Sequence, residues 1–388
     1  MWNEVFFFAK TLAFTTTTTG TSATLVGTSG TDSATLAAAL TTVKSNAFEG
    51  ADNIVTASNL TSSSFGFGSA ADTLTLGGTL GTSTVKLGDG ADSFTDGGFT
   101  LTSVTVQGGG GADTFTLNNA TTAATLQGGQ GADTFTITNA GGTGNRFVGG
   151  SEADTFTLTA TGANSFTNGQ VGADTITVAA TIGAGSTVRG GSEGDTITNN
   201  NTGIAIYGDK GADTITDGTG ASTIDGGEGA DTIASGGGAD TITGGAGADT
   251  FTIANGQGSD YSVVDTDGSG TVTAGDTFQL AGAAGTAVTN ITDFATGDIL
   301  NTTLGTATTG INQVVGATGA AGAGGWIGIA GDGSFFSGNW NSATNIFTVT
   351  AAGAGSSSLV ITQGGANNLN AILLEGTNTS VFTTASFS

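Results

Sequence analysis

Aspartates recur along this chain at nearly constant spacing, and they are the residues whose type and position best suit chemistry. From Asp52 to Asp195 the members of this series stand 20 or 21 residues apart, and from Asp195 to Asp249 the interval falls to 18 and then 9. Most of them end a glycine-rich block in which Gly-x-Gly-Ala-Asp is followed by Thr, an apolar residue and Thr. Hard cations such as Ca²⁺ take carboxylate and carbonyl oxygens, and glycine allows a turn to point its carbonyls inward. The series therefore predicts repeated calcium sites.

The composition excludes most other chemistry. The chain of 388 residues has no histidine, cysteine or proline, and its 31 acidic and six basic side chains give a net charge of −25. Without His or Cys there is no Ser-His-Asp or Cys-His catalytic centre and no zinc site of the usual kind. A surface with this charge repels nucleic acid, and no stretch reaches the roughly 18–20 apolar residues of a membrane span. No acid pair outside the repeats forms a recognisable catalytic motif, so we expect a protein that is not an enzyme.

Apolar residues flank the aspartates at two fixed offsets, which define the elements that position the turns. Because threonines alternate around these residues, the pattern predicts short strands with one buried face. One coil of two such strands buries almost nothing, whereas stacked coils bury a continuous column. The expected fold is all-β, a parallel β-solenoid. The inward residues two positions after the aspartates are Ile54, Leu74, Phe94, Phe115, Phe135, Phe156, Ile176, Ile197, Ile215, Ile233, Ile242 and Phe251, and those seven positions before are Phe65, Val85, Val106, Leu126, Phe147, Val188, Ile206, Ile224 and Ile233.

Four segments carry the repeat in its most complete form: GGGGADTFT (108–116), GGQGADTFT (128–136), GGEGADTIA (226–234) and GGAGADTFT (244–252). They resemble the glycine-rich nonapeptide of the RTX, or hemolysin-type calcium-binding, family, and the resemblance covers roughly residues 45–260. It implies a right-handed parallel β-roll in which six residues form each turn and three form each strand. It also implies that Ca²⁺ binds between turns stacked on the same edge.

Stacking gives the intact turns a physical reason to bind calcium. Coils about 4.8 Å apart bring successive carboxylates face to face, and a divalent cation removes their mutual repulsion. Alternatively, the aspartates only hydrogen-bond the backbone of their own turns. The opposite edge, for example residues 118–125, lacks aspartate and is expected to be largely free of calcium. The assigned ligands are Asp113, Asp133, Asp213, Asp231, Asp240 and Asp249, with Asp260 of NGQGSD (255–260) as a weaker candidate.

Several turns depart from the pattern, which leaves calcium binding open there. Glu152 and Glu193 each replace a turn glycine, Ala70 does so before Asp72, and the turn before Asp174 reads NGQVGAD. A glutamate in such a turn is itself a candidate side-chain ligand.

A second calcium signature follows the repeats. Residues 265–276 read DTDGSGTVTAGD and match the twelve-residue EF-hand loop, although the flanking segments favour strands over helices. Asp276 takes the last position, where the longer Glu is usual, so bidentate binding there is harder. The alternative is an Asp-rich hairpin without metal. The ligands expected from this loop are Asp265, Asp267 and Ser269 through their side chains, Thr271 through its carbonyl, and Asp276.

The ends of the chain differ from the repeats. Residues 1–14 are apolar but lack the basic start of a secretory signal, and they are expected either to cap the first coil or to dock on another subunit. The C-terminal tail is rich in hydroxyl residues and is similar to the uncleaved signals of type I secretion. The expected organisation is an N-terminal segment (1–44), a calcium β-roll (45–260), an EF-hand-like loop with a roll-closing segment (261–300) and an antiparallel β domain (301–388).

Together these features predict a calcium-dependent, self-assembling extracellular structural protein, such as a surface-layer or filament subunit. Its partner would be further copies of itself in a homopolymer or lattice. Two alternatives remain open. One is a calcium-dependent adhesin for cell-surface glycans, which would use Trp326 and Trp340; the other is an ice-binding solenoid, which would use the outward Thr-x-Thr pairs of the strands.

Overall fold

In a computed structural model, the described part of the chain consists of β-strands joined by turns. The structure describes residues 15–253 apart from 20, 37–39, 47–48, 139–140, 180–182, 201–202 and 237–239; after residue 253 it describes the strands alone. The chain divides into two compact units, Met1–Asn201 and Thr202–Ser388. No helix that could span a membrane occurs in the described ranges.

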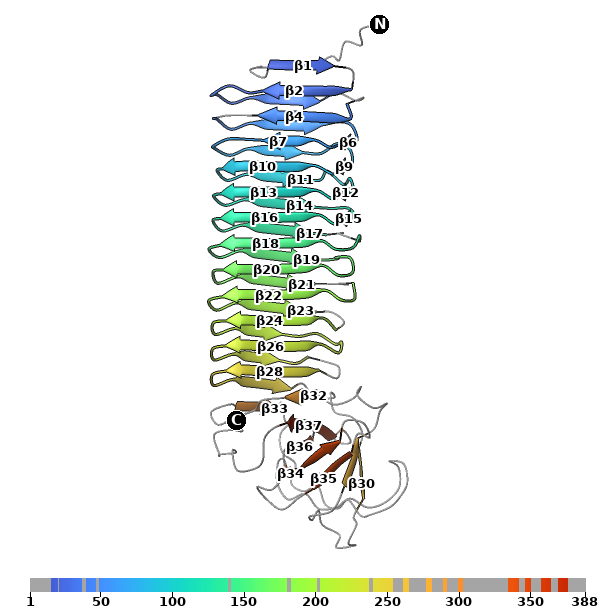
Figure 1. Ribbon diagram of the computed structural model, residues 1–388. Coiled ribbons are helices and arrows are strands. Elements are labelled where there is room, and N and C mark those ends of the chain that lie inside the picture. The colour runs from blue at the N-terminus through green and yellow to red at the C-terminus, as the bar shows by residue number, and fades with distance from the viewer. Residues whose placement is uncertain are drawn as a thin grey trace. The chain divides into compact units, whose positions relative to one another are not determined.

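The first unit is a stack of coils in which each strand pairs in parallel with its counterpart one coil later (Figure 1). Two strands of each coil form two facing layers. The first layer contains β2 (Ser22–Val26), β4 (Thr42–Asn46), β7 (Ser64–Gly66), β10 (Thr84–Asp89), β13 (Thr105–Gly110), β16 (Thr125–Gln130), β18 (Arg146–Ser151), β20 (Phe166–Val171) and β22 (Thr187–Ser192). The second contains β3 (Ser33–Leu36), β5 (Asn53–Thr56), β8 (Thr73–Thr75), β11 (Ser93–Thr95), β14 (Thr114–Leu117), β17 (Thr134–Ile137), β19 (Thr155–Leu158), β21 (Thr175–Val178) and β23 (Thr196–Asn199).

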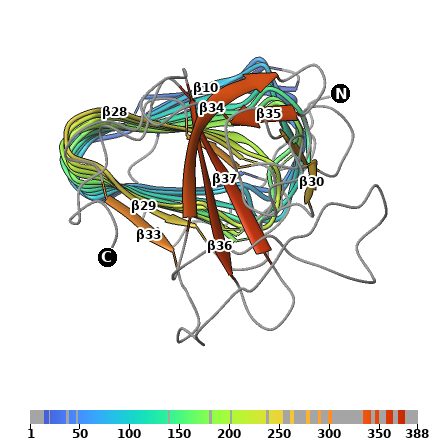
Figure 2. The ribbon, with the colours of Figure 1, turned by 90° about the horizontal axis from the view of Figure 1, so that it is seen from below.

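The second unit repeats this arrangement with shorter coils. Its first layer is formed by β24 (Ala205–Lys210), β26 (Thr223–Glu228) and β28 (Thr241–Ala246), and its second by β25 (Thr214–Thr216), β27 (Thr232–Ala234) and β29 (Thr250–Ile253). An end-on view shows β28 and β29 in opposite layers, joined through a rounded turn edge (Figure 2). The prediction of an all-β parallel solenoid is therefore confirmed.

The core is a set of residue columns that run along the stack. The apolar residues predicted to point inward from both layers are buried, so the period-two interpretation is confirmed. The rings of Phe115, Phe135 and Phe156 stack on one another with centroids 4.6 and 4.5 Å apart and nearly parallel planes. These separations match the spacing of neighbouring strands, because the backbone pairing sets where each ring lies.

A third short strand in four coils was not predicted. It comprises β6 (Leu60–Thr61), β9 (Leu80–Gly81), β12 (Leu101–Thr102) and β15 (Thr121–Thr122), paired in parallel at the edge opposite the aspartate turns. Leu60, Leu80 and Leu101 are buried there. The coils of the first unit are longer than those of the second, and the extra length provides the residues of this third strand.

At the N-terminal end of the stack the strand pairing is antiparallel instead of parallel. β1 (Thr15–Thr19) runs antiparallel to β2 and satisfies the outer edge of that strand. Residues 1–14 lie outside the described residues.

The rest of the second unit is described by its strands: β30 (Tyr261–Val264), β31 (Thr277–Leu280), β32 (Thr289–Ile291), β33 (Ile299–Thr302), β34 (Ser334–Asn341), β35 (Ile346–Val349), β36 (Ser357–Gln363) and β37 (Leu369–Glu375). β32 and β33 add in parallel to β28 and β29. The later strands pair antiparallel, β34 with β35 and β36, and β36 with β37.

Candidate calcium-binding edge

The repeated aspartates form a hydrogen-bond ladder along one edge of the coils. The backbone N–H of Asp113 donates to Oδ1 of Asp133 (2.7 Å), and that of Asp133 donates to Oδ1 of Asp154 (2.7 Å). The same bond, at 2.6–2.9 Å, joins Asp32, Asp52, Asp72, Asp92, Asp113, Asp133, Asp154, Asp174 and Asp195 in the first unit, and Asp213, Asp231 and Asp249 in the second. After the first aspartate of each unit, each carboxylate thus caps the turn of the preceding coil rather than its own turn.

In most of these aspartates the second carboxylate oxygen, Oδ2, accepts no hydrogen bond from the backbone of another coil. All these aspartates are buried, with at most 2% of the residue exposed. Oδ2 has no hydrogen-bond partner in Asp52, Asp72, Asp92, Asp113, Asp133, Asp154, Asp174 and Asp231. A buried, unsatisfied carboxylate oxygen is costly unless a proton or a cation neutralises it.

Burial alters the acidity of the ladder accordingly. Desolvation raises the pKa of Asp133 to about 8 from its ordinary 3.8; the hydrogen bond from the Asp113 backbone opposes this, and the neighbouring carboxylates add to the rise. Desolvation likewise raises the pKa of Asp113 and of Asp154 to about 7. Without a cation, the fold therefore holds these carboxyls partly protonated near neutral pH.

Glycine allows Oδ2 to lie directly against the turn backbone. The first glycine of the turn faces the interior, and a Cβ added at Gly128 would overlap Asp133 Oδ2 and lie 2.7 Å from the carbonyl oxygen of Gly149. Gly108, Gly149 and Gly169 have the same relation to the aspartate five residues later and to the glycine carbonyl of the next coil, at 2.6–2.7 Å. In the second unit Gly208 and Gly226 repeat it.

These oxygens fit Ca²⁺. Each turn brings a buried carboxylate oxygen and a carbonyl from the next coil beside the same glycine, and such oxygens are the ligands that calcium takes. Among the described residues no three acidic side chains gather in one place, so carbonyls would have to supply most of the coordination. Bound calcium would neutralise the negative charge of the buried carboxylates. The aspartates and turn glycines of this chain would hold the ion and fix the turn between two coils.

The opposite edge serves as an internal comparison. There the backbone N–H of Val43 donates to Oγ of Ser63 (2.9 Å), and that of Ala124 donates to Oδ1 of Asn145 (3.1 Å). Ser83, Ser186 and Ser222 accept in the same way. Neutral side chains therefore suffice to cap a turn in this fold. A charged residue with a second oxygen is not needed for capping, which favours a metal role for the aspartate edge.

Most predicted ligands within the described residues share the aspartate edge. Asp113 and Asp133 lie on it in the first unit, and Asp213, Asp231 and Asp249 lie on it in the second. Asp240 lies on the opposite edge, where its Oδ1 accepts from the backbone N–H of Ser222 (2.8 Å). The other predicted ligands, namely Asp260, Asp265, Asp267, Ser269, Thr271 and Asp276, lie outside the described residues.

The ladder also includes residues that the sequence analysis missed or left open. Asp32 begins it, and its Oδ2 accepts from the backbone N–H of Thr28 (2.6 Å). The segment TSGTDS (28–33) is a degraded copy of the turn, and its position one full repeat before Asp52 was the available signal. Asp154 and Asp174, in turns that depart from the motif, occupy the same register as their neighbours.

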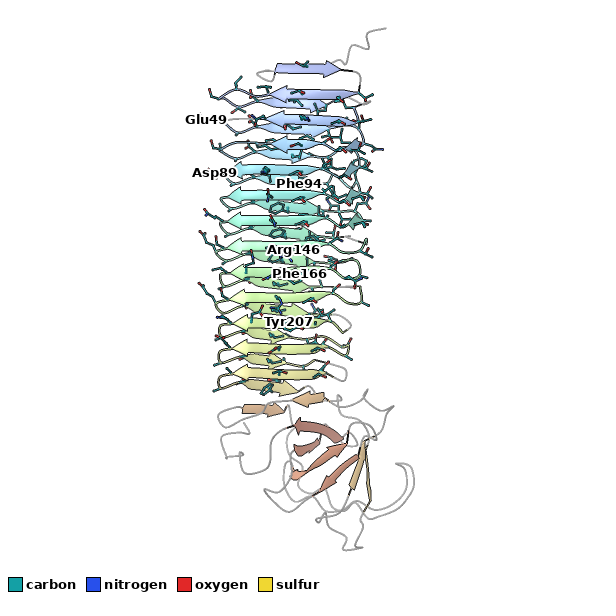
Figure 3. All side chains as sticks on the ribbon, viewed as in Figure 1. Glu49, Asp89, Phe94, Arg146, Phe166 and Tyr207 are labelled. Carbon is teal, nitrogen blue, oxygen red and sulfur yellow. The ribbon has the colours of Figure 1, made fainter. Side chains whose placement is uncertain are left out.

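The unusual turn residues keep the turn backbone. Ala70, Glu152 and Glu193 adopt φ of 84°, 77° and 78° at a position where other coils have glycine with positive φ. Gln170 has φ of 85° at a different turn position, where the neighbouring coils have Gly150 and Gly191. Glu152 is exposed, yet its charge contributes to the raised pKa of Asp133 and Asp154. At the outer tip of other turns lie Glu49 and Asp89 (Figure 3).

Comparison with known proteins agrees with this geometry. The model of the RTX calcium-binding nonapeptide repeat (4 copies) matches residues 207–242 and 229–260. No curated protein matches the chain. RTX nonapeptide repeats bind calcium, and they are typical of secreted proteins. The matched residues include the turns of Asp213, Asp231 and Asp249, whose ladder and close glycine–Oδ2 approach recur in the first unit. The chain therefore carries the calcium-binding repeats of the RTX family.

Proposed function

We propose that this protein is a calcium-dependent structural protein that assembles with copies of itself outside the cell. The observation that carries this proposal is the register of the aspartate edge within each unit. One turn is repeated coil after coil, so calcium would bind along a continuous array rather than at one site. Calcium bound along such an array would make the stacked coils more rigid, which suits a structural protein.

Charge connects calcium to assembly. A net charge of −25 keeps calcium-free chains apart and opposes close packing within one chain. Calcium bound along the edge lowers this repulsion both within and between molecules. Because ligands are brought together only by folding, calcium binding also contributes directly to folding free energy. A chain whose fold is weak at low calcium and stable at high calcium suits export followed by folding outside the cell.

The test is a calcium titration of the full chain, with magnesium at equal ionic strength as the control. Circular dichroism reports strand formation, and light scattering with negative-stain microscopy reports assembly in the same samples. We expect the strand signal to increase as calcium is added, ordered filaments or sheets to follow at higher calcium, and a chelator to reverse both. Strand formation that yields only monomers at every calcium concentration would overturn self-assembly while leaving calcium-driven folding intact.

A second candidate function, ice binding, is favoured by one surface. The outward threonines of β14, β17, β19, β21 and β23 lie in register in two parallel columns, and all of them are exposed or half-exposed. Neighbouring threonines are about 4.8 Å apart across strands and about 6.6 Å apart along one strand. The columns are Thr114, Thr134, Thr155, Thr175 and Thr196, and Thr116, Thr136, Thr157, Thr177 and Thr198.

Thermal hysteresis tests this candidate. Wild-type protein in calcium should depress the freezing point below the melting point, and Thr136→Tyr should abolish the gap because a bulky ring breaks the flat grid. A matched control is Thr125→Tyr on the other layer, which should leave the gap unchanged. Ordinary freezing of the wild type at high protein concentration would exclude ice binding. Threonine would then be present for its strand propensity alone.

A further inference from the structure

Among the described residues of the first unit, every charged side chain that is not buried lies on one of two adjoining surfaces. One is the first-layer face, formed by the outward residues of the strands from β4 to β22, and the other is the outer tip of the aspartate edge. Figure 3 shows Arg146 on this face and Glu49 and Asp89 at the edge. The second-layer strands of this unit carry no charged residue. The bases on the face are Lys44, Lys86, Arg146 and Arg189, and the acids at the edge are Glu49, Asp89, Glu152 and Glu193.

The bases recur at unequal intervals along the stack. Lys86 lies two coils after Lys44, and Arg146 lies three coils after Lys86. Arg189 follows after two further coils. Because neighbouring strands are about 4.8 Å apart, the four bases span about 34 Å of the face.

The acids at the turn tips recur at the same intervals and in the same coils. Asp89 lies two coils after Glu49, since Ser69 pairs with both. Glu152 directly follows β18, three coils after Asp89, and Glu193 directly follows β22, two coils later still. Both series therefore have the intervals two, three and two.

Three of the four bases are not paired with an acid within the described residues. Lys44, Lys86 and Arg146 form no ion pair there, although each has an acid in its own coil. The guanidinium of Arg146 lies over the ring of Phe166, 4.5 Å from its centroid, which keeps it on the face. The face and the edge thus present two matching charge series to the surroundings.

We propose that the first-layer face of one copy docks on the aspartate edge of the next copy, coil against coil, so that all four bases meet acids. This inference rests on the proposed self-assembly and names the two surfaces that meet. Because these surfaces differ, the contact is heterologous and continues from copy to copy unless it closes into a ring. An exposed ion pair contributes little alone, so docking depends on the whole series and weakens with salt.

Reversing one charge tests the docking. Lys86→Glu should raise the protein concentration needed for assembly in saturating calcium at least about tenfold, because repulsion replaces attraction. The interval series reads the same from both ends, so charge permits the next copy to run in either direction. Adding Asp89→Lys should restore assembly if neighbouring copies are parallel, and adding Glu152→Lys should restore it if they are antiparallel. Light scattering measures assembly, and circular dichroism checks that each variant folds.

A matched pair of variants separates the docking surface from the total charge. Lys86→Gln and Thr114→Glu change the net charge equally, but Thr114 lies outward on β14 in the second layer. Lys86→Gln should raise the concentration needed for assembly about two- to fivefold. Glutamine fits that column, where Gln107 donates to Gln127 (3.0 Å). Thr114→Glu should leave the concentration unchanged.

Cross-linking identifies the two surfaces directly. The chain has no cysteine, so single cysteines can be placed on the face by Thr125→Cys and at the edge by Gln130→Cys. These two variants, mixed in calcium with a short bismaleimide, should give cross-linked dimers. Thr134→Cys, on the second layer, should give few dimers with the edge variant.

The outcomes distinguish this inference from the function on which it rests. Assembly that tolerates Lys86→Glu, or a reversal that neither second substitution repairs, would overturn the docking surfaces and leave self-assembly standing. Equal dimer yields from the Thr125→Cys and Thr134→Cys mixtures would do the same. A wild type that folds in calcium but stays monomeric at every concentration would overturn self-assembly and the docking together.

Discussion

The backbone N–H of Asp113 donates to Oδ1 of Asp133, 2.7 Å away in the next coil. The aspartate of one coil is therefore part of the turn of the coil before it. One oxygen performs this structural task, and Oδ2 of Asp133 lies against Gly128 without a hydrogen-bond partner. The two oxygens of one side chain thus divide between holding the stack and offering a ligand.

This division predicts different effects for two substitutions of Asp133. Asp133→Ala removes the ladder acceptor and should lower the free energy of unfolding by about 1–3 kcal/mol with or without calcium, because a buried N–H loses its partner. Asp133→Asn should lower it only in the presence of calcium. Urea denaturation in chelator and in calcium separates the two. Equal losses for both variants in chelator would contradict the division of roles.

The calcium-free protein should become less stable as pH rises. Burial raises the pKa of Asp113 to about 7 and of Asp133 to about 8, against 3.8 in the unfolded chain. Between about pH 4 and 8 the folded state therefore holds protons that the unfolded state has released, so the free energy of unfolding falls across this window. Thermal melting in chelator from pH 5 to 8 measures it, and a melting temperature that rises with pH would contradict it.

Calcium should reverse that dependence. Because the ion binds the deprotonated carboxylate, protons compete with it and are released when it binds. In saturating calcium the melting temperature should rise from pH 5 to pH 7. In chelator it should fall over the same range. Magnesium at the same concentration is the control, since it requires a more rigid octahedral shell and gives up its water reluctantly.

The phenylalanine stack should contribute strongly to stability. Phe135 lies between the rings of Phe115 and Phe156 and is fully buried. Phe135→Ala should lower the free energy of unfolding by about 3–5 kcal/mol because it leaves a cavity that the rigid coils cannot fill. The adjacent outward residue offers a control: Thr136→Ala should change stability by less than about 0.5 kcal/mol. Similar effects for the two would show that the column is loosely packed.

Two glycines with positive φ should differ in their tolerance of a side chain. Gly129 has φ of +122°, and a Cβ there would overlap the carbonyl oxygen of Gly109. Gly144 has φ of +71° with no atom within 4 Å of such a Cβ. Gly144→Ala should cost about 1 kcal/mol, the ordinary strain of a left-handed residue. Gly129→Ala should cost clearly more, because a neighbouring backbone must move; equal thermal shifts would contradict this.

Sequence alone determined the two main strands of each coil, their inward columns and the calcium chemistry of the turns. Ile54, Phe94 and Phe135 were placed correctly because a strand has a period of two and the repeat aligns one coil with the next. These are local patterns that recur, so a single chain displays them many times. The degraded first copy at Asp32 was missed because too few of its residues match the motif.

Only the tertiary structure determines which residues of neighbouring coils lie opposite one another. The acceptor for the Asp113 N–H belongs to the next coil, and the close approach of Asp133 Oδ2 to Gly128 depends on how that coil folds. The placement of Asp240 on the opposite edge and the third strand at Leu80 likewise depend on the path of each coil. Periodicity specifies which side of a strand a residue faces, whereas the space in front of it is set by neighbours that are distant in sequence.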